Sequence, residues 1–356
     1  MFDGYNGHKI VDDNVIGYSP LMSPRNLKDR LPLTDRERET VVLGRRYIRD
    51  ILDGGGRKLL VVGPCSISDP VAARDYAERL RGLAEDVHNS FVTVMRMYGE
   101  KPRTSIGWKG LINEPYLDGQ ENINAGLRIA REMLITNAGM GLPSGTEFLD
   151  TFTPQYIGDL TSWAAIGART TESQQHREMA SGLSMTVGFK NGTNGNTDVA
   201  VNAVLSARHP HHFFGLDQDG VPSIVATRGN PYTHIVLRGG DGSTNYDRDS
   251  VQIAQHMLRR AGLSERLMID CSHGNSGKDY RQQPVVFEDV IRQIVDGNNG
   301  IIGMMLESNL YEGSQKIPED PGDLRYGVSV TDSCIGWETT ANLIRDAHRS
   351  LSRRVR

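Results

Sequence analysis

The amino-acid sequence predicts a (β/α)8 barrel preceded by an N-terminal arm. Eight short apolar runs alternate with stretches of helical periodicity from residue 58 onward, and apolar strands separated by helices indicate a parallel sheet covered by helices. Polar and charged residues follow nearly every run, as in a barrel that collects its functional groups at the carboxyl ends of its strands. A doubly wound open sheet is the alternative, but no glycine-rich dinucleotide fingerprint follows any run.

The predicted elements follow one another at the spacing of successive strand–helix units. The strands are expected at residues 58–63, 91–98, 141–148, 164–171, 185–190, 234–239, 267–273 and 301–307. Helical patterns are expected at residues 35–52, 70–87, 123–137, 153–163, 174–182, 197–207, 249–262, 285–296 and 337–352. Residues 209–232 interrupt the alternation, and we expect them to be irregular.

The beginning of the chain differs from the rest. Residues 1–45 are polar and are punctuated by proline and glycine. We therefore expect an N-terminal arm over residues 1–45 and a single barrel domain over residues 46–356. The helix at 35–52 should lead into the first strand and end at the glycine run 54–56.

Composition excludes several classes of protein. The net charge is −4 and the isoelectric point is near 6.2, which argues against a nucleic-acid or membrane-surface protein. No apolar run approaches the ~20 residues of a membrane span, and the first residues do not follow the pattern of a signal peptide. Three widely spaced cysteines form no disulfide framework, so a reducing cytoplasm is the expected location.

Positive charge is concentrated in residues 94–110, VMRMYGEKPRTSIGWKG. An isolated basic loop is most often a solvated surface. Here, however, further cations follow later strands, and the barrel would bring six of them to one mouth. They are Arg96, Lys101, Arg103, Arg169, Lys190 and Arg238. Because Arg and Lys hold phosphate and carboxylate groups well, we expect a ligand with more than one anionic group.

A second set of residues at the strand ends has the chemistry of metal ligands. Cys65, His273 and Glu307 follow or end predicted strands, and Asp332 lies in the loop after the eighth. A thiolate, an imidazole and two carboxylates suit a divalent ion such as Mn, Fe, Co or Zn. Each residue alone is more often a buried core group, and only the barrel joins the four. A metal beside an anion pocket suggests Lewis-acid activation of a carbonyl or phosphoryl oxygen.

Other enzyme classes lack their motifs. The sequence contains neither a G-x-x-x-x-G-K-[ST] phosphate loop nor a G-x-S-x-G nucleophile turn, which argues against a nucleotide kinase or a serine hydrolase.

Eight segments resemble the class I 3-deoxy-D-arabino-heptulosonate 7-phosphate (DAHP) synthases over nearly all of the chain from about residue 37. They are GPCS (63–66), EKPRTSIGWKGLINEP (100–115), SWAAIGARTTESQ (162–174), GFKNGTNG (188–195), HIVLRGG (234–240), IDCSHGNS (269–276), GMMLES (303–308) and SVTDSCIGWE (329–338). The cysteine of IDCSHGNS and the phrase GNP before HIVLRGG are most similar to the tryptophan-sensitive branch.

The resemblance implies a metal-dependent condensation of phosphoenolpyruvate with erythrose 4-phosphate, the first step of the shikimate pathway. It implies that Cys65, His273, Glu307 and Asp332 bind the metal, and that Arg96, Lys101, Arg169, Lys190 and Arg238 bind phosphoenolpyruvate. Pro102, Arg103, Thr104 and Ser105 of the KPRTS motif would bind erythrose 4-phosphate. Lys101 is the expected proton-transfer group, and Glu147 is expected to position a water molecule.

The resemblance also implies regulation through the arm. In the family the arm packs across a subunit interface beside an aromatic amino-acid effector site, in dimers or tetramers. Residues at the matching positions are Asp12, Asp13, Pro154, Gln155 and Ser184, and tryptophan is the expected effector. A solvated arm without this role is the alternative.

Three positions depart from the usual family pattern. Gly99 replaces a common aromatic residue, Ser68 a histidine and Glu114 an aspartate. We expect Gly99 to make the loop before Lys101 more mobile. A different aldose acceptor and a catalytically silent binding protein are the alternative functions, but no expected ligand or phosphate contact is missing.

Overall fold

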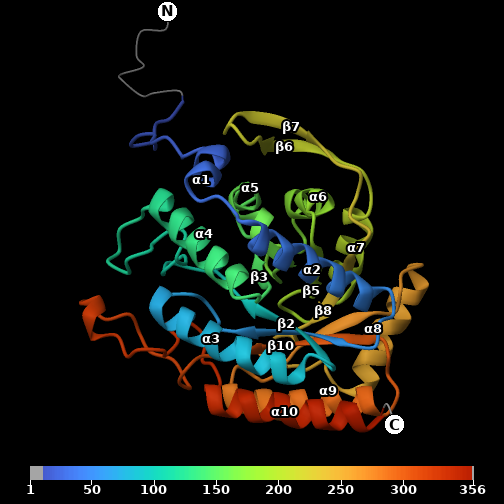
Figure 1. The fold of residues 1–356 in the computed structure, drawn as a ribbon. Helices are drawn as coiled ribbons and strands as arrows, with labels where there is room; N and C mark the ends of the chain where they lie inside the picture. Colours follow the sequence, from blue (N-terminus) through green and yellow to red (C-terminus); the bar gives the residue numbers. More distant parts are fainter. Residues whose placement is uncertain (1–10, 355–356) are drawn as a thin grey trace, which may run out of the picture.

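The computed structural model describes residues 11–354 and contains a closed barrel of eight parallel strands (Figure 1). The strands follow the order β1-β10-β9-β8-β5-β4-β3-β2 around the barrel. Their bounds are β1 (Lys58–Gly63), β2 (Phe91–Arg96), β3 (Ser144–Glu147), β4 (Thr161–Ile166), β5 (Thr186–Lys190), β8 (Thr233–Leu237), β9 (Leu267–Asp270) and β10 (Ile301–Glu307). The predicted fold class is confirmed.

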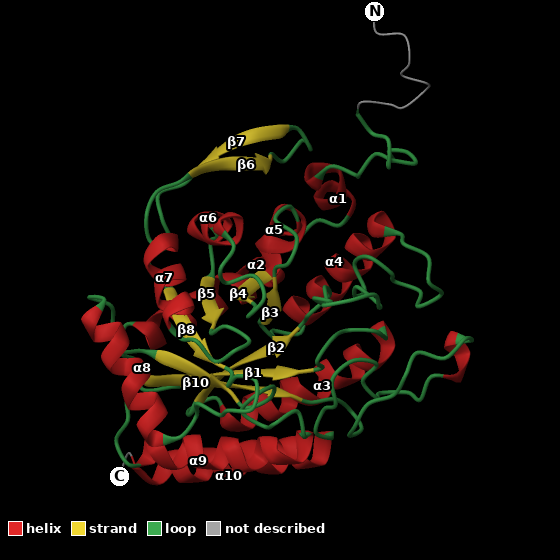
Figure 2. Cartoon of the chain, turned by 180° about the vertical axis from the view of Figure 1, so that it is seen from behind, coloured by secondary structure: helices red, strands yellow, loops and turns green. Residues whose placement is uncertain are grey.

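Helices surround this barrel, with α9 packed against α10 and α10 against α3 (Figure 2). The helices are α1 (Pro24–Arg30), α2 (Asp35–Leu52), α3 (Pro70–Val87), α4 (Ile123–Gly139), α5 (Thr153–Ile157), α6 (Gln174–Gly182), α7 (Asp198–Ala207), α8 (Arg248–Arg260), α9 (Gln283–Val295) and α10 (Trp337–Arg354), with short 3-10 turns η1 (Gly158–Leu160), η2 (Tyr280–Gln282) and η3 (Pro321–Asp323). Among the described residues, no helix is long and apolar enough to cross a membrane.

The alternation of side chains along each strand separates the core into two parts. Val61, Val94 and Val236 belong to an inner cluster with Trp163, whereas Leu60 and the other intervening residues pack toward the helices. Because side chains alternate with a period of two, the residues two positions beyond Val94 and Val236 also face the interior. These are Arg96 and Arg238, so the same pattern that fills the barrel places cations at its mouth.

Helix α2 closes the opposite end of the barrel. Ile48 and Ile51 join the inner cluster, and α2 contacts strands β1, β2, β4 and β5. A capping box between Thr34 and Glu37 fixes the start of the helix. The expected division between arm and barrel at residues 45 and 46 falls inside this helix.

Several local expectations were wrong. The helix expected at 153–163 is only α5 and a 3-10 turn, and β4 already begins at Thr161. The arm contains α1, which Ser23 caps. Residues expected to be irregular form a two-stranded antiparallel hairpin, β6 (His212–Leu216) and β7 (Pro222–Ala226). Its mostly exposed strands bury too few side chains to produce a clear apolar signal.

His234 is buried inside the barrel, and no charged side chain among residues 11–354 pairs with it. Its Nε2 accepts a hydrogen bond from Trp163 Nε1 at 3.0 Å, and its Nδ1 lies 3.0 Å from the carbonyl oxygen of Ile235. Burial lowers the pKa of His234 to about 4 because the imidazolium would lose its hydration. The folded chain therefore holds this histidine neutral.

The lowered pKa predicts a loss of stability in mild acid. In the unfolded chain His234 takes up a proton near pH 6.5, whereas in the folded chain it does so only near pH 4. The contribution of neutral His234 to the free energy of unfolding is therefore fully present above about pH 6.5 and is lost as the pH falls toward 4. At pH 5 this contribution to the free energy of unfolding is lower by roughly 2 kcal/mol than at neutral pH. Urea unfolding between pH 7.5 and 4.5 should show this slope, and His234→Gln, which keeps an acceptor for Trp163, should reduce it. His256→Gln on the exposed face of α8 is the control, and an unchanged slope in His234→Gln would contradict the prediction.

Candidate active site

The carboxyl ends of the strands surround a cavity of about 860 Å³. Cys65 is buried at its edge with no exposed surface, and nearly all other predicted substrate and metal residues line the cavity directly. These residues are Arg96, Lys101, Pro102, Arg103, Thr104, Ser105, Glu147, Arg169, Lys190, Arg238, His273, Glu307 and Asp332. The structure therefore brings together the residues that the sequence predicted for one mouth.

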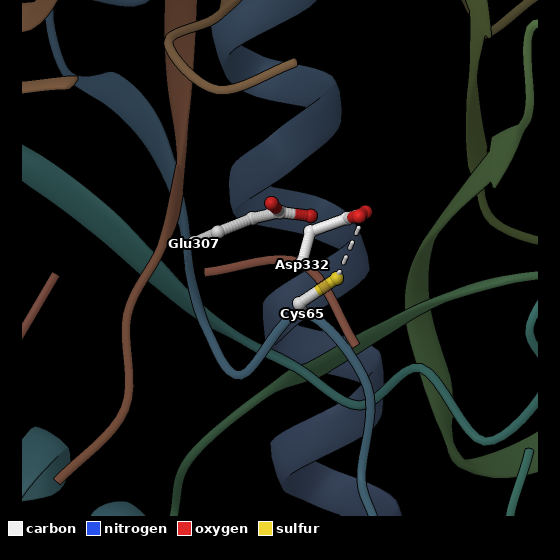
Figure 3. Close-up of side chains that lie close together, drawn as sticks. All are labelled: Cys65, Glu307 and Asp332. Carbon is white, nitrogen blue, oxygen red and sulfur yellow. Dashed lines mark hydrogen bonds between the residues drawn. The ribbon is translucent and has the colours of Figure 1, made fainter. Parts of the chain in front are cut away.

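Three of the four predicted metal ligands form a tight group (Figure 3). Cys65 follows β1, Glu307 ends β10, and Asp332 lies before α10. One donor atom of each lies within 4.8 Å of the others, and Cys65 Sγ is 3.5 Å from Asp332 Oδ2. Ligands of a single tetrahedral ion at about 2.0–2.3 Å lie about 3–4 Å apart. The group therefore fits a metal ion.

His273, the fourth predicted ligand, lies beside this group. Its Nε2 is 3.6 Å from Glu307 Oε1, so the imidazole faces the same space as the carboxylates. Its backbone has a φ of 56°, which is uncommon for a residue with a Cβ and concentrates at functional sites.

Lys101 shows that this position accepts positive charge. Its Nζ is 2.9 Å from Cys65 Sγ and 3.0 Å from Asp332 Oδ2. Burial would raise the pKa of Asp332, but Lys101 outweighs burial and holds that pKa below its ordinary value. Burial, with a smaller contribution from Glu307, raises the pKa of Cys65 to about 11. The thiol must therefore lose its proton when a metal binds.

Asp270 connects the predicted metal ligands with the predicted anion-binding cations, and sequence reasoning missed it. It ends β9 with no exposed surface. Asp270 Oδ2 lies 3.0 Å from His273 Nδ1 and 2.9 Å from Lys190 Nζ. A carboxylate on the second ring nitrogen orients a histidine so that its other nitrogen can bind a metal. The sequence feature that could have identified Asp270 is its D-x-x-H spacing to His273, directly after an apolar run.

The cations of the mouth fall into two groups. Arg96 pairs with Glu307 at 2.9 Å, Lys190 with Asp270 and Lys101 with Asp332. Arg103, Arg169 and Arg238 form no ion pair within the described part of the chain. These three ion pairs reduce the repulsion among the six cations, and within the described chain three arginines remain without a carboxylate.

The loop that carries KPRTS is held at several points. Lys101 N donates to Lys109 O, and Ile112 N donates to Gly99 O, both at 2.9 Å. The buried Glu100 carboxylate accepts from Leu149 N and Asp150 N. A Cβ on Gly99 would lie 3.3 Å from the Ile112 side chain, so Ile112 occupies the space beside the glycine. The expected mobility from Gly99 is opposed by these contacts.

The predicted effector residues are less closely assembled. Pro154 and Gln155 lie in α5, where Gln155 Oε1 accepts from Gln218 Nε2 in the β6–β7 turn at 2.6 Å. Ser184 is exposed between α6 and β5. Asp12 and Asp13 are also exposed, and no hydrogen bond or ion pair within residues 11–354 joins them to the other three.

Helix α1 ties the arm to the same region. Arg25 Nε lies 2.5 Å from Asp219 Oδ1, and Lys28 donates to Gln218 at 2.7 Å. The hairpin, α1, α5 and α6 lie together on one side of the molecule (Figure 1).

The comparison with known proteins agrees with this geometry. The DAHP synthetase I family model matches residues 31–345. The chain is 52% identical to the Tyr-sensitive phospho-2-dehydro-3-deoxyheptonate aldolase of Salmonella typhimurium, over 98% of this chain and 97% of that protein. It is 47% identical to the phenylalanine-inhibited aldolase of Saccharomyces cerevisiae, over 94% and 92%.

A solved structure supports the same assignment. The phospho-2-dehydro-3-deoxyheptonate aldolase of Francisella tularensis has a TM-score of 0.93 and 46% identity, over 96% of this chain and 99% of that one. These relatives do not carry the tryptophan-sensitive name expected from the sequence, so that subtype stays a prediction. The chain belongs to the DAHP synthetase I family.

Proposed function

We propose that this protein condenses phosphoenolpyruvate with erythrose 4-phosphate, giving 3-deoxy-D-arabino-heptulosonate 7-phosphate and inorganic phosphate. Membership of the family and the shared name of the relatives support this product over one made from another aldose. The observation that carries the proposal is a mouth where thiol, imidazole and carboxylate groups adjoin three arginines that have no carboxylate partner among the described residues. No expected ligand is lost, which argues against a catalytically silent protein.

In this proposal a divalent ion, Mn, Fe, Co or Zn, is held by Cys65, His273, Glu307 and Asp332. The mixed donor set tolerates any of these ions. When bound, the ion supplies Lewis-acid polarisation of the aldehyde of the second substrate. Asp270 keeps the His273 ring in the orientation that leaves Nε2 free for the ion.

The five cations proposed for phosphoenolpyruvate divide between its two anionic groups. Arg169 and Arg238 lack carboxylate partners in the described chain and suit the phosphate, which carries the larger charge. Arg96 and Lys190 lie deeper and are already paired with carboxylates, so they suit the singly charged carboxylate. Lys101 stands between this pocket and the metal ligands.

Erythrose 4-phosphate is assigned to the loop at the rim. Arg103, Thr104 and Ser105 are exposed and line the cavity together with Pro102. A guanidinium and two hydroxyl groups can bind a phosphate dianion. Both substrates are then fixed with their reacting carbons facing each other, which lowers the entropic part of the barrier.

With the aldehyde polarised and both anionic substrates bound, the two substrates can react. C3 of the enol phosphate forms a bond to the aldehyde carbon, and the aldehyde oxygen takes a proton. Water adds at C2, and the resulting hemiketal phosphate loses inorganic phosphate. Lys101, whose Nζ lies 2.9 Å from Cys65 Sγ and 3.0 Å from Asp332 Oδ2, is the proposed proton donor to the aldehyde oxygen. Glu147, buried beside Gly167, orients the water.

We also propose that the arm, residues 1–45, contributes to assembly and feedback control. Asp12, Asp13, Pro154, Gln155 and Ser184 would form an effector site for an aromatic amino acid in a homodimer or homotetramer. The sequence favours tryptophan, whereas the names of the relatives favour tyrosine or phenylalanine. The three free, buried cysteines suit a reducing compartment such as the cytoplasm.

The first test is phosphate release from phosphoenolpyruvate with erythrose 4-phosphate, in metal-stripped and Mn-restored protein. We expect turnover only with metal and inhibition by one of tryptophan, tyrosine and phenylalanine added singly. Asp13→Ala should weaken that inhibition without changing the uninhibited rate. Turnover with another aldose but not with erythrose 4-phosphate would refute the proposed acceptor.

The metal site predicts a specific effect of one cysteine. Loss of an outer hydrogen-bond partner typically weakens metal binding about 10–100-fold, so loss of a ligand in Cys65→Ala should weaken it by at least about 100-fold. Equilibrium dialysis against Mn or Zn measures this directly. Cys271→Ala is the matched control, because Cys271 is equally buried but packs toward the helices. Equal metal affinity in Cys65→Ala and Cys271→Ala would show that Cys65 is not a metal ligand.

The two anion pockets predict opposite kinetic effects of two arginines. Arg238→Ala should raise KM for phosphoenolpyruvate roughly 10- to 100-fold and leave KM for erythrose 4-phosphate nearly unchanged, because a hydrogen bond to a charged group is lost. Arg103→Ala should show the reverse. Steady-state kinetics with each substrate varied in turn separates them. If KM for both substrates rose equally in both variants, the assignment of Arg238 to phosphoenolpyruvate and of Arg103 to erythrose 4-phosphate would be wrong.

A further inference from the structure

Tyr98 is a buried tyrosine at the bottom of the active-site cavity to which no role has been assigned above. It follows Arg96 by two positions and faces the same side. Its backbone is fixed because Ile67 N donates to Tyr98 O at 2.9 Å and the preceding Met97 N donates to Gly145 O at 2.7 Å. The residue is only 2% exposed yet lines the cavity, so its position is set by the loop after β1 on one side and by β3 on the other.

The ring of Tyr98 supports two of the cations proposed for phosphoenolpyruvate. The guanidinium carbon of Arg96 lies 3.5 Å from the ring centroid, and Lys190 Nζ lies 6.0 Å from it. Both distances are within the range of cation–π attraction. The aromatic ring alone explains why a large planar side chain is present, but it does not explain the hydroxyl group.

The hydroxyl of Tyr98 has no hydrogen-bond partner among residues 11–354. A buried hydroxyl without a partner is unfavourable, and tyrosine usually satisfies its hydroxyl when buried. Burial raises the pKa of Tyr98, so the group stays protonated and remains a hydrogen-bond donor. An anionic ligand in the cavity would supply an acceptor for this neutral donor, because Tyr98 lines the cavity beside two cations.

Resting on the proposed function, we propose that Tyr98 Oη donates a hydrogen bond to the carboxylate of phosphoenolpyruvate. The carboxylate is the group assigned to Arg96 and Lys190, the two cations that lie against the Tyr98 ring. Arg96 and Lys190 attract the carboxylate by charge, and the Tyr98 hydroxyl adds a directional hydrogen bond. Because the hydroxyl is neutral, it adds no further positive charge that must be desolvated. Tyr98 is thus a substrate-binding residue for this one group.

The test is Tyr98→Phe, which removes the hydroxyl and keeps the ring on Arg96. We expect the dissociation constant of phosphoenolpyruvate, measured by calorimetry on the Mn-loaded protein, to rise about tenfold or more. KM for erythrose 4-phosphate should stay within twofold, and inhibition by inorganic phosphate should be unchanged because phosphate binds at the other cations. The melting temperature should not fall, since no protein hydrogen bond is lost.

Tyr76→Phe is the control, because Tyr76 is equally buried on α3, edge-on to Trp337 at 5.4 Å and outside the cavity. A phosphoenolpyruvate dissociation constant within twofold of wild type in Tyr98→Phe would overturn the proposal, and so would an equal weakening of inorganic phosphate. If Tyr98→Phe were unstable, its melting-temperature increase with added phosphoenolpyruvate would give the same comparison. Failure of the wild-type protein to turn over would refute the proposed function instead.

Discussion

The buried pairs Arg96–Glu307 and Lys190–Asp270 are the interactions on which the site depends. All four side chains are less than a tenth exposed, and an unpaired charge at this depth would cost several kcal/mol. Pairing allows the barrel to keep cations at the ends of β2 and β5 before any anion binds. It also holds the guanidinium and ammonium groups in fixed positions, which lowers the ordering cost of binding a small anion and so favours affinity.

The same carboxylates connect the predicted anion-binding cations to the predicted metal-binding group. Glu307 contacts both Arg96 and His273, and Asp270 contacts both Lys190 and His273. The two halves of the site therefore share an electrostatic network, and a change in one half shifts the other. Removing Asp270 would leave Lys190 unpaired and free the ring of His273 to turn. Removing Glu307 would leave Arg96 unpaired and would also remove a predicted metal ligand.

The sequence predicted the barrel and its mouth because both depend on simple alternation along the chain. Residues that were missed lack such a signal. Asp270 lies inside the expected strand 267–273 and Tyr98 ends the expected strand 91–98, so neither was assigned a role of its own. The exposed β6–β7 hairpin has weak apolar patterning. Their importance depends on neighbours distant in sequence, such as Lys190 beside Asp270 across 80 residues. Only the folded chain reveals such pairings.

Burial varies systematically from the bottom of the cavity to its rim. Arg96 and Glu307 are almost completely buried, whereas the Asp332 side chain is 61% exposed, and Arg103, Thr104 and Ser105 are exposed as well. A molecule seated on the rim loop would cover the deep pocket. If phosphoenolpyruvate occupies the deep pocket and erythrose 4-phosphate the rim loop, as proposed, then phosphoenolpyruvate must enter first.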